Sequence, residues 1–319
     1  MMNLTRAECA RFLRGNDRFT IITHGGPDGD TLGSAAALCL GLRQIGKVAH
    51  VLENPQISEK FLYLVEGLTK PAVEDTDVLV AVDVAGVRMI PEEVRPLADK
   101  IALRIDHHGS GVSFAEQELV DSAAAACSEI IYDLLSLLDV ELDAAIANAL
   151  YTAVATDTGC FRFANATGNS FALASACAYV SPDIYRINQK LFDTVTLGRL
   201  RLQSWVVEHM QVLQDGKIVV CAIPADIQEK LNLADEDMGN LSGFLRSIEG
   251  VKMAATVRQD NEGHTGFSVR AVPGCDAAAV CEKLGGGGHK GAAGAGMVDV
   301  TMEDAMQALL AALPDLCEN

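Results

Sequence analysis

One short stretch, Thr23 to Ser34, constrains this chain more than any other part of it. It reads T-H-G-G-P-D-G-D-T-L-G-S and follows a β-branched run, Phe19 to Thr23. An Ala/Leu-rich helical pattern follows, so the polar stretch lies where a strand ends and a helix begins, a usual place for chemistry in open α/β sheets. His24, Asp28 and Asp30 offer nitrogen and oxygen donors without a thiolate, which suits a divalent cation such as Mn²⁺. The alternative is a turn that caps the helix, with His24 merely packed.

Two later runs have the composition of buried parallel strands and end in acidic residues. Residues 77–83 read D-V-L-V-A-V-D, and residues 100–106 read K-I-A-L-R-I-D. Nearly continuous apolar runs are typical of parallel strands that are buried on both faces. Asp83 ends the first run and is either a helix cap or a metal ligand.

The second run ends in Asp106 and is followed at once by His107 and His108. Two adjacent imidazoles at a turn favour a functional site over packing. One of them can bind a metal while its neighbour points to the substrate, and Asp106 would then orient an imidazole.

A fourth acidic position lies at the end of a predicted helix over residues 144–156. Asp157 follows this helix and precedes a glycine break, T-D-T-G. The helix dipole disfavours a carboxylate at a helix C-terminus. A nearby cation would remove that penalty, so the sequence favours a ligand over a surface aspartate.

The second half of the chain contains an unusual glycine run, G-G-G-G-H-K-G-A-A-G, over residues 285–294. A flexible linker is the simplest interpretation, but linkers are rarely followed by His289, Lys290 and small residues that could start a helix. Exposed backbone N–H groups beside these two side chains would make an anion site. Ser268 and Arg270 alternate along a predicted strand, so both can face the same ligand.

Composition limits the remaining classes. The chain has 319 residues, enough for one large domain or two ordinary ones, and its net charge of −18 disfavours a broad surface for long nucleic acids. No apolar run is long enough to predict a membrane span, and the N-terminus has no signal-peptide pattern. The nine cysteines are odd in number and include no C-x-x-C pair. We therefore expect reduced core cysteines and a cytoplasmic location.

Together, these motifs resemble those of the DHH phosphoesterases. The His24 to Asp30 stretch, the strand that ends in Asp83, Asp106-His107-His108 and Asp157-Thr158-Gly159 match the four motifs of that family in order. Residues 285–294 resemble the glycine-His motif of its C-terminal DHHA1 domain. Length and domain order are most similar to the nanoRNase/pAp phosphatase branch, which degrades very short RNA and dephosphorylates 3′-phosphoadenosine 5′-phosphate (pAp).

The resemblance implies an α/β fold in two domains. Residues 1–185 would form a DHH catalytic domain with a mostly parallel sheet flanked by helices. Residues 186–214 would form a helical linker, and residues 215–319 a smaller α/β DHHA1 domain that binds the substrate. A helix is expected from Ser34 to Gly46, after the first motif.

The resemblance also implies a division of roles among the motif residues. One metal would be held by His24, Asp28 and Asp83, and the other by Asp30, Asp83, His107 and Asp157, with Asp83 as the bridge. The catalytic set would comprise Asp83, Asp106, His107 and His108, with two Mn²⁺ ions, or Mg²⁺ or Co²⁺, activating a water. Substrate contacts would come from His108, Ser268, Arg270, Gly287, Gly288 and His289.

The expected substrates are short RNA, dinucleotides such as pApA, or pAp, with no membrane partner and with a homodimer as one option. Three rival functions stay open at this point. A phosphodiesterase for cyclic di-AMP or linear dinucleotides would share every catalytic residue. A family II inorganic pyrophosphatase shares the metal motifs but lacks a glycine-His run of this kind. A non-catalytic nucleotide sensor would be expected to have lost some ligands, whereas all the matched positions here hold competent residues.

Overall fold

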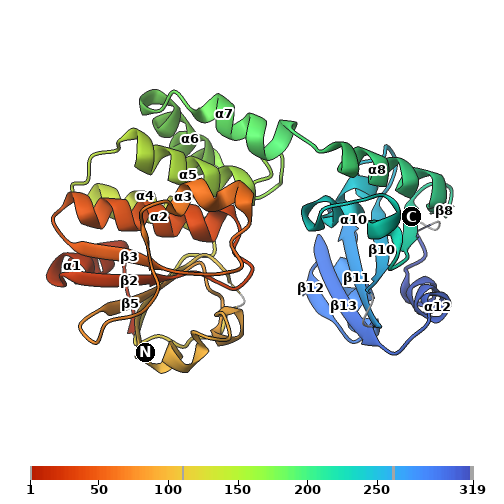
Figure 1. Cartoon of the computed structure of the whole chain (residues 1–319), viewed down its shortest axis with the longest axis horizontal. Coiled ribbons are helices and arrows are strands. Elements are labelled where there is room, and N and C mark those ends of the chain that lie inside the picture. The colour runs from red at the N-terminus through yellow and green to blue at the C-terminus, as the bar shows by residue number, and fades with distance from the viewer. Residues whose placement is uncertain (1, 110, 261–262, 317–319) are drawn as a thin grey trace. The chain divides into compact units, whose positions relative to one another are not determined.

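The structure is a computed structural model that describes residues 2–109, 111–260 and 263–316. It divides into two compact units, residues 1–194 and 195–319 (Figure 1). The segment 186–214 contributes to both. Helix α7 (Ile184–Asn188) and a π-helical turn (Gln189–Asp193) belong to the first unit, and helix α8 (Leu197–His209) and strand β8 (Gln211–Leu213) belong to the second.

The first unit is built on a parallel sheet of seven strands. In sheet order these are β1 (Met2–Asn3), β7 (Gln117–Val120), β6 (Ile101–Asp106), β5 (Val78–Val82), β2 (Arg18–Ile22), β3 (Val48–Leu52) and β4 (Thr69–Lys70). Every neighbouring pair is parallel. The chain runs from β2 to β3 on one side and later returns to β5 on the other side of β2. The carboxyl ends of β2 and β5 therefore flank a topological switch point, where open α/β sheets bind ligands.

Helices lie on one face of this sheet in more than one layer, as Figure 1 shows. They are α1 (Arg6–Gly15), α2 (Gly29–Gln44), α3 (Leu62–Val65), α4 (Cys127–Leu137), α5 (Ala144–Asp157) and α6 (Gly168–Val180). The other face carries a smaller apolar layer that includes residues of the 3₁₀ turns Val87–Met89 and Arg95–Lys100. A third 3₁₀ turn, Glu59–Phe61, lies on the helical face, where Phe61 packs into the larger cluster. The strands are thus buried on both sides, which explains their continuous apolar sequences.

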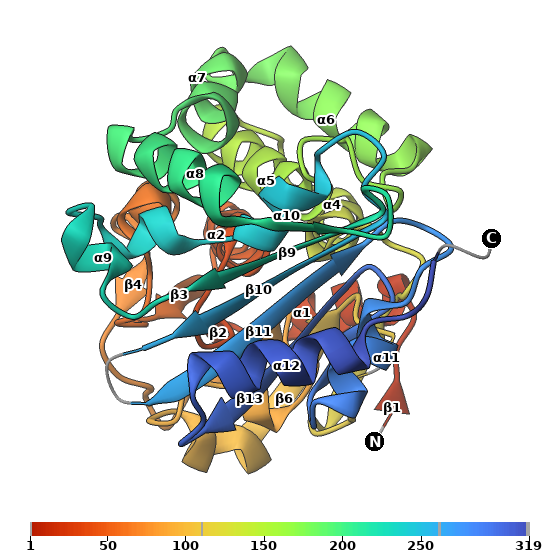
Figure 2. The ribbon, with the colours of Figure 1, turned by 90° about the vertical axis from the view of Figure 1, so that its right-hand side faces the viewer.

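The second unit is a mixed sheet of six strands. Their order is β12 (Gly287–His289), β13 (Ala292–Val298), β11 (His264–Ala271), β10 (Met253–Gln259), β9 (Ile218–Ile223) and β8, and only β9 and β10 are paired in parallel. One face packs on α11 (Ala277–Lys283) and α12 (Met302–Ala312), and the other on α8, α9 (Ile227–Lys230) and α10 (Leu241–Arg246) (Figure 2).

The predicted α/β fold class is confirmed, but two local predictions are wrong. The helix after the first motif begins at Gly29 and not at Ser34, because the Asp28 carboxylate accepts the N–H groups of Asp30 and Thr31 and starts the helix early. The small residues after Lys290 form strand β13 and not a helix. Pairing with β11 on one side and β12 on the other overrides the helical preference of alanine.

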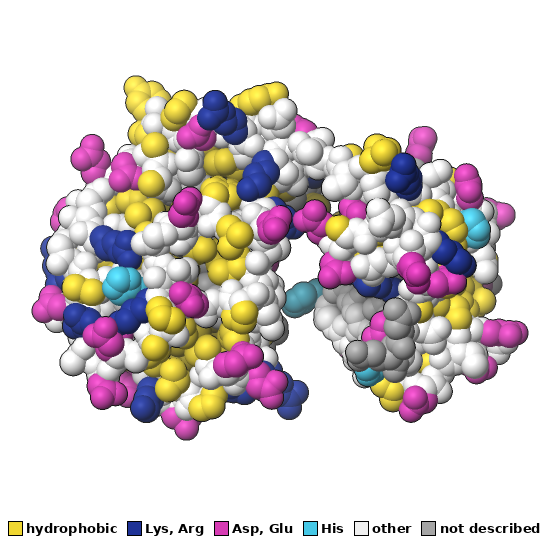
Figure 3. Space-filling view, in the orientation of Figure 1, with side chains coloured by type: hydrophobic (Ala, Val, Ile, Leu, Met, Phe, Trp, Pro, Cys, Tyr) yellow, Lys and Arg dark blue, Asp and Glu magenta, His cyan; other side chains and the backbone are white. Residues whose placement is uncertain are grey.

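All eight described cysteines are free thiols, six of them buried. Within the described residues, no helix has the length and apolar character needed to cross a bilayer. On the faces that Figure 3 shows, Lys and Arg side chains are interspersed with acidic ones in each unit and do not form one basic stripe.

Candidate metal centre and anion face

The four motifs of the first half meet at the carboxyl edge of the parallel sheet. His24 follows β2, Asp83 follows β5, and His107 follows β6, and these three strands are neighbours. The first turn of α2 adds Asp30, and the last residue of α5 is Asp157. Three overlapping groups of side chains are close enough to share a cation: His24/Asp28/Asp83, Asp30/His107/Asp157 and Asp83/His107/His108.

The first group lies around the His24 imidazole. Its Nε2 is 3.6 Å from Asp28 Oδ1 and 3.8 Å from Asp83 Oδ2. Asp28 is half-exposed, whereas Asp83 is buried. One nitrogen and two oxygens thus converge on a point at the protein surface.

The second group lies around the His107 imidazole. Its Nε2 is 3.7 Å from Asp30 Oδ2, 3.4 Å from Asp83 Oδ1 and 3.4 Å from Asp157 Oδ2. Asp83 therefore presents one oxygen to each imidazole, since its Oδ2 is the atom nearest His24. This is the arrangement that a bridging carboxylate requires.

Both imidazoles are fixed by backbone carbonyls. His24 Nδ1 lies 2.9 Å from Gly25 O, and His107 Nδ1 lies 3.2 Å from Ala124 O. A carbonyl only accepts, so each Nδ1 is the donor and carries the proton. Each Nε2 is then left as the atom that can bind a metal, which is the usual second-layer arrangement for histidine ligands.

Asp83 provides the test of whether a cation fits this site. The residue has a left-handed backbone, φ 59°, which is uncommon outside glycine and is often found at functional sites. Its Oδ1 is buried and accepts no well-formed hydrogen bond from the described residues. A buried carboxylate oxygen without a donor is unfavourable unless a cation compensates it. The donor set and this oxygen both fit a divalent metal.

Asp30 is positioned by the first turn of α4, a contact that the sequence did not predict. Its two carboxylate oxygens accept the N–H of Cys127 at 2.6 Å and of Ser128 at 3.2 Å, and also the hydroxyl of Ser34 at 3.0 Å. Ala126 at the N-cap of α4 has no side chain that could cap the helix. Asp30 therefore caps α4 from another helix, which fixes its carboxylate beside His107.

Two glycines let α2 approach α5 closely enough to bring Asp30 to Asp157. A Cβ on Gly33 would lie 2.3 Å from Ala149 O, and a Cβ on Gly29 would lie 2.5 Å from the Thr156 side chain. Both distances are shorter than any normal contact. The two glycines are four residues apart and therefore lie on the same helix face. The spacing is present in the sequence, but it does not by itself predict which helix packs there.

The proton affinities reflect several carboxylates crowded into one site. Burial, together with repulsion from Asp83 and Asp157, raises the pKa of Asp30 well above its ordinary value. Burial is also the main reason that the pKa of Asp157 rises to about 6. Burial lowers the pKa of His24 and of His107, but their carboxylate neighbours outweigh it and raise these pKa values to about 9 and about 10. Without metal, protons therefore supply the positive charge.

Metal binding should accordingly release protons. At pH 7 the metal-free imidazoles of His24 and His107 are protonated, because pH 7 lies below pKa values of about 9 and about 10. A metal ligand must be a neutral imidazole, so loading both groups should release at least about two protons per chain. The apparent affinity for Mn²⁺ should thus increase from pH 6 to pH 8. Calorimetry in two buffers of different ionisation enthalpy measures the release, and a heat that is the same in both would contradict this assignment.

The His108 imidazole is oriented by a side chain, Asp106, and not by a backbone carbonyl. Its Nδ1 donates to Asp106 Oδ1 at 2.8 Å, and Asp106 is fully buried. The other ring nitrogen, Nε2, is left for a ligand, and the side chain is 30% exposed. The structure thus places Asp106 behind His108, while Nε2 of His107 is directed to the carboxylates.

In the second unit, the residues expected to bind substrate lie on one face of the sheet. Ser268 and Arg270 alternate in β11, and Arg270 Nη1 donates to Ser268 Oγ at 3.3 Å. Ala292 of β13 pairs with Arg270 on one side and with His289 on the other. Directly paired residues face the same side, so His289 and Arg270 flank a floor of small residues about 10 Å wide.

The glycine run is required by the tight hairpin. Gly288 has φ +143°, and a Cβ there would lie 2.6 Å from Ala293 Cα; a Cβ on Gly286 would lie 2.2 Å from Gly294 O. Gly287 is paired with Gly294. Burial lowers the pKa of Arg270, and repulsion from Arg246 adds to this effect. Among the described residues no carboxylate forms an ion pair with Arg270, so the face has excess positive charge available for an anion.

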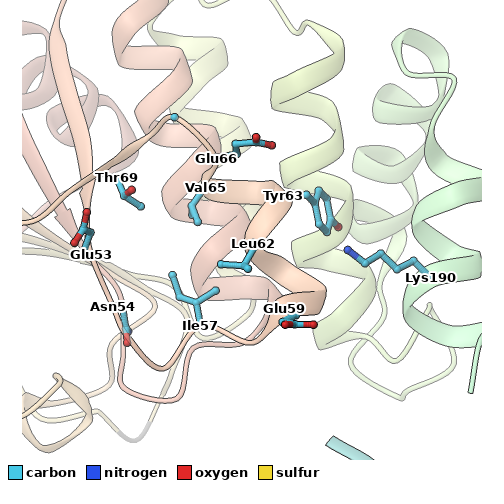
Figure 4. A pocket seen from close by; sticks show the side chains of 11 residues that line it. Glu53, Asn54, Ile57, Glu59, Leu62, Tyr63, Val65, Glu66, Thr69 and Lys190 are labelled. Carbon is cyan, nitrogen blue, oxygen red and sulfur yellow. The ribbon is translucent and has the colours of Figure 1, made fainter. Parts of the chain in front are cut away.

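Two of the cavities in the first unit differ in their relation to the metal centre. One, about 250 Å³, is lined by Asp28 and Asp157 of the metal groups and by Lys60, Phe61, Leu191 and Phe192 among others. The other, about 690 Å³, shares no residue with the metal groups. Figure 4 shows it between Tyr63 and Lys190 on one side and Glu53, Asn54 and Thr69 on the other. Of these two, the smaller cavity adjoins the metal centre, and its aromatic wall could not be predicted from the sequence.

The family models described as "DHH family, N-terminal domain" and "DHHA1 domain" match residues 18–155 and 215–319. The "bifunctional oligoribonuclease and PAP phosphatase NrnA" of Thermus thermophilus is 31% identical over 295 residues, covering 92% of this chain and 88% of that protein.

A second type of relative is less similar. The "cyclic-di-AMP phosphodiesterase GdpP" of Geobacillus thermodenitrificans is 24% identical, and the match covers 95% of this chain but only 48% of that protein. Among solved structures, an exopolyphosphatase-related protein from Bacteroides fragilis has a TM-score of 0.83 at 23% identity, covering 96% of this chain and 94% of that one. This last likeness concerns the fold alone.

Proposed function

This chain belongs to the DHH–DHHA1 phosphoesterase family, and we propose that it hydrolyses short oligoribonucleotides, dinucleotides such as pApA, and pAp. The observation that carries this proposal is the set of side chains gathered at the carboxyl edge of the parallel sheet, in which His24 Nε2 and His107 Nε2 each face two or more carboxylates. The crowded carboxylates need cations to compensate their charge, and cations held in this way can bind a phosphate group.

Two divalent cations, with Mn²⁺ as the first choice, are the proposed cofactors. His24, Asp28 and Asp83 would hold one, and Asp30, Asp83, His107 and Asp157 the other. When bound, such cations activate a water molecule for attack on phosphorus and offset the negative charge of the phosphate. The proposed role of these six residues is therefore to hold the two cations.

His108 is the residue proposed to hold the scissile phosphate. Asp106 accepts the Nδ1–H hydrogen bond, so Nε2 is the ring nitrogen that can face a phosphate oxygen. When the imidazole is protonated, its Nε2–H is a charge-assisted donor. Because a metal-activated water would attack phosphorus, no residue of the chain needs to act as a nucleophile.

The cavity beside Asp28 and Asp157 supports a nucleoside substrate over inorganic pyrophosphate. Its volume of about 250 Å³ is bounded by Phe61, Leu191 and Phe192, which are apolar, and by the aliphatic stem and ammonium of Lys60. The Lys60 ammonium lies 4.8 Å from the centre of the Phe61 ring. An apolar wall next to a metal site suits a nucleobase, because bases stack on aromatic side chains. Inorganic pyrophosphate has no apolar part that could bind to this wall.

The second unit is proposed to bind a phosphate that is not cleaved. Arg270 and His289 would then contribute binding that is equal in the ground state and the transition state. Arg270→Ala and His289→Ala should each raise KM for pAp and pApA about tenfold and change kcat much less. An aryl phosphate ester, which has one phosphate only, should lose little.

Steady-state kinetics on both substrate types measure this difference. Arg258→Ala provides the matched control, because it removes an exposed arginine from the neighbouring strand β10. If the two variants lose activity equally on all substrates and melt at a lower temperature, Arg270 and His289 support the fold and do not anchor phosphate.

A turnover panel tests the function as a whole. The manganese-loaded protein is assayed on pAp, pApA, RNA of two to five nucleotides, cyclic di-AMP and pyrophosphate. We expect the first three classes to be hydrolysed fastest. Fastest hydrolysis of cyclic di-AMP would favour a cyclic-di-AMP phosphodiesterase over the proposed function. Binding without hydrolysis of any substrate would indicate a nucleotide sensor.

A further inference from the structure

Arg104 is a charged residue in the middle of a buried strand and is used by none of the roles described so far. It lies on β6, is 2% exposed, and is among the largest fully buried side chains of the chain. Burying a guanidinium is unfavourable unless it is well paired. A lone arginine in such a strand therefore indicates a specific task.

The guanidinium is paired on two sides. Its Nη2 donates to Asp106 Oδ2, and its Nη1 lies 3.5 Å from Glu118 Oε2 on the adjacent strand β7. Both carboxylates are buried as well, with Asp106 at 0% and Glu118 at 4% exposure. Arginine suits this position because its planar fork can bind two carboxylates at fixed angles, which lysine cannot do.

The surroundings hold the guanidinium in place. Phe114 covers it, with the guanidinium carbon 5.5 Å from the ring centre. A Cβ on Gly111 would lie 2.2 Å from Arg104 Nη2, so the loop after His108 packs directly on it. Glu118 Oε1 accepts the N–H of Phe114 at 2.9 Å, which ties this loop to the same carboxylate. Arg104 is thus at the centre of a rigid buried network.

This network leads to the active site through one residue. Asp106 uses Oδ2 for Arg104 and Oδ1 for both the N–H of His107 at 2.8 Å and the Nδ1 of His108 at 2.8 Å. The position of Oδ1 depends on the rotation of the carboxylate, which Arg104 fixes through the other oxygen. We propose that Arg104 is a positioning residue that sets the orientation of the His108 imidazole, and with it the Nδ1–H hydrogen bond, through Asp106. The proposal rests on the phosphoesterase function and not on the choice of substrate.

A double-mutant cycle separates this role from simple support of the fold. Arg104→Met should lower kcat on pAp about tenfold with little change in KM or in Mn²⁺ affinity, since a misplaced imidazole loses transition-state contacts. In a His108→Gln background the same change should cost less than about twofold, because the residue on which Arg104 acts is gone. Arg104→Lys should recover only part of the rate.

The control is Arg18→Met, which removes another arginine that pairs with two carboxylates on this sheet, Glu74 and Asp77, but at the opposite end of the strands. It should lower the melting temperature without a coupling to His108. Equal factors for Arg104→Met in both backgrounds would overturn the proposal and make Arg104 a structural residue.

A measurement that does not depend on catalytic turnover tests the role of Arg104 even if the proposed function is wrong. Long-range ¹H–¹⁵N spectra of the magnesium-loaded protein report the two His108 ring nitrogens, with His108→Gln assigning the signals. We expect a proton on Nδ1, hydrogen-bonded to Asp106, in the native protein and a weakened Nδ1–H signal in Arg104→Met. An unchanged Nδ1–H signal in that variant would refute the proposal, whereas an inactive native protein with the expected spectra would refute only the function.

Discussion

Asp83→Asn is expected to reduce turnover of pAp by at least about a hundredfold, because it removes the charge of the carboxylate that faces both imidazoles. Asp83 Oδ1 lies 3.4 Å from His107 Nε2, and its Oδ2 lies 3.8 Å from His24 Nε2. Asparagine is the appropriate replacement, since it has nearly the same volume and tolerates the left-handed backbone at φ 59°. The loss should exceed that of Asp28→Asn, which affects one group only.

Asp77→Asn is the matched control for this prediction. Asp77 precedes the same strand β5 that Asp83 follows, is equally buried, and pairs with Lys70 and with Arg18 at the other end of the sheet. Its replacement should lower stability but leave kcat within about threefold. Near-normal kinetics and full metal content in Asp83→Asn would show that the bridge is assigned to the wrong residue.

Gly33→Ala is the second substitution with a large expected effect. The new Cβ would lie 2.3 Å from Ala149 O, and α2 and α5 would have to separate by about 1 Å to restore a normal contact. That movement carries Asp30 away from Asp157, and a misplacement of about 1 Å can lower turnover about a hundredfold. Unfolding free energy should fall by about 2–3 kcal/mol. Kinetics and denaturant unfolding measure the two effects.

Gly41→Ala on the same helix separates packing from catalysis. Its Cβ would meet Leu135 Cδ2 at 2.3 Å, the end of a side chain that can rotate away, and this contact is remote from the carboxylates. We expect a smaller loss of stability and a normal kcat. If Gly33→Ala also keeps its kcat, the close approach of the two helices does not position the metal ligands.

The sequence could predict the fold class and the gathering of the motifs because both follow from local patterns. Continuous apolar runs indicate parallel strands, and their carboxyl ends necessarily meet at one edge, so His24, Asp83 and His107 were expected together. The same reasoning identified Ser268 and Arg270 as residues of one sheet face. These arguments need only the period of a strand and the direction of a sheet.

Contacts between distant segments could not be predicted in this way. The N-terminus of α4 that holds Asp30, the carbonyl of Ala124 that orients His107, and the approach of Gly33 to α5 all depend on how helices pack. Arg104 was visible as a charge within an apolar strand, but its partner Glu118 is on another strand. The small residues after Lys290 form a strand and not the expected helix, because pairing with β11 and β12, and not local preference, decides their structure.

Titration of the metal-free chain with Mn²⁺, following bound metal and pAp hydrolysis in the same samples, tests the central claim most directly. The account predicts no hydrolysis without metal and a rise in turnover that is complete only when two ions are bound per chain. Full activity of the chelator-treated, metal-free protein, or full activity with one ion per chain, would contradict the two-metal centre built on Asp83.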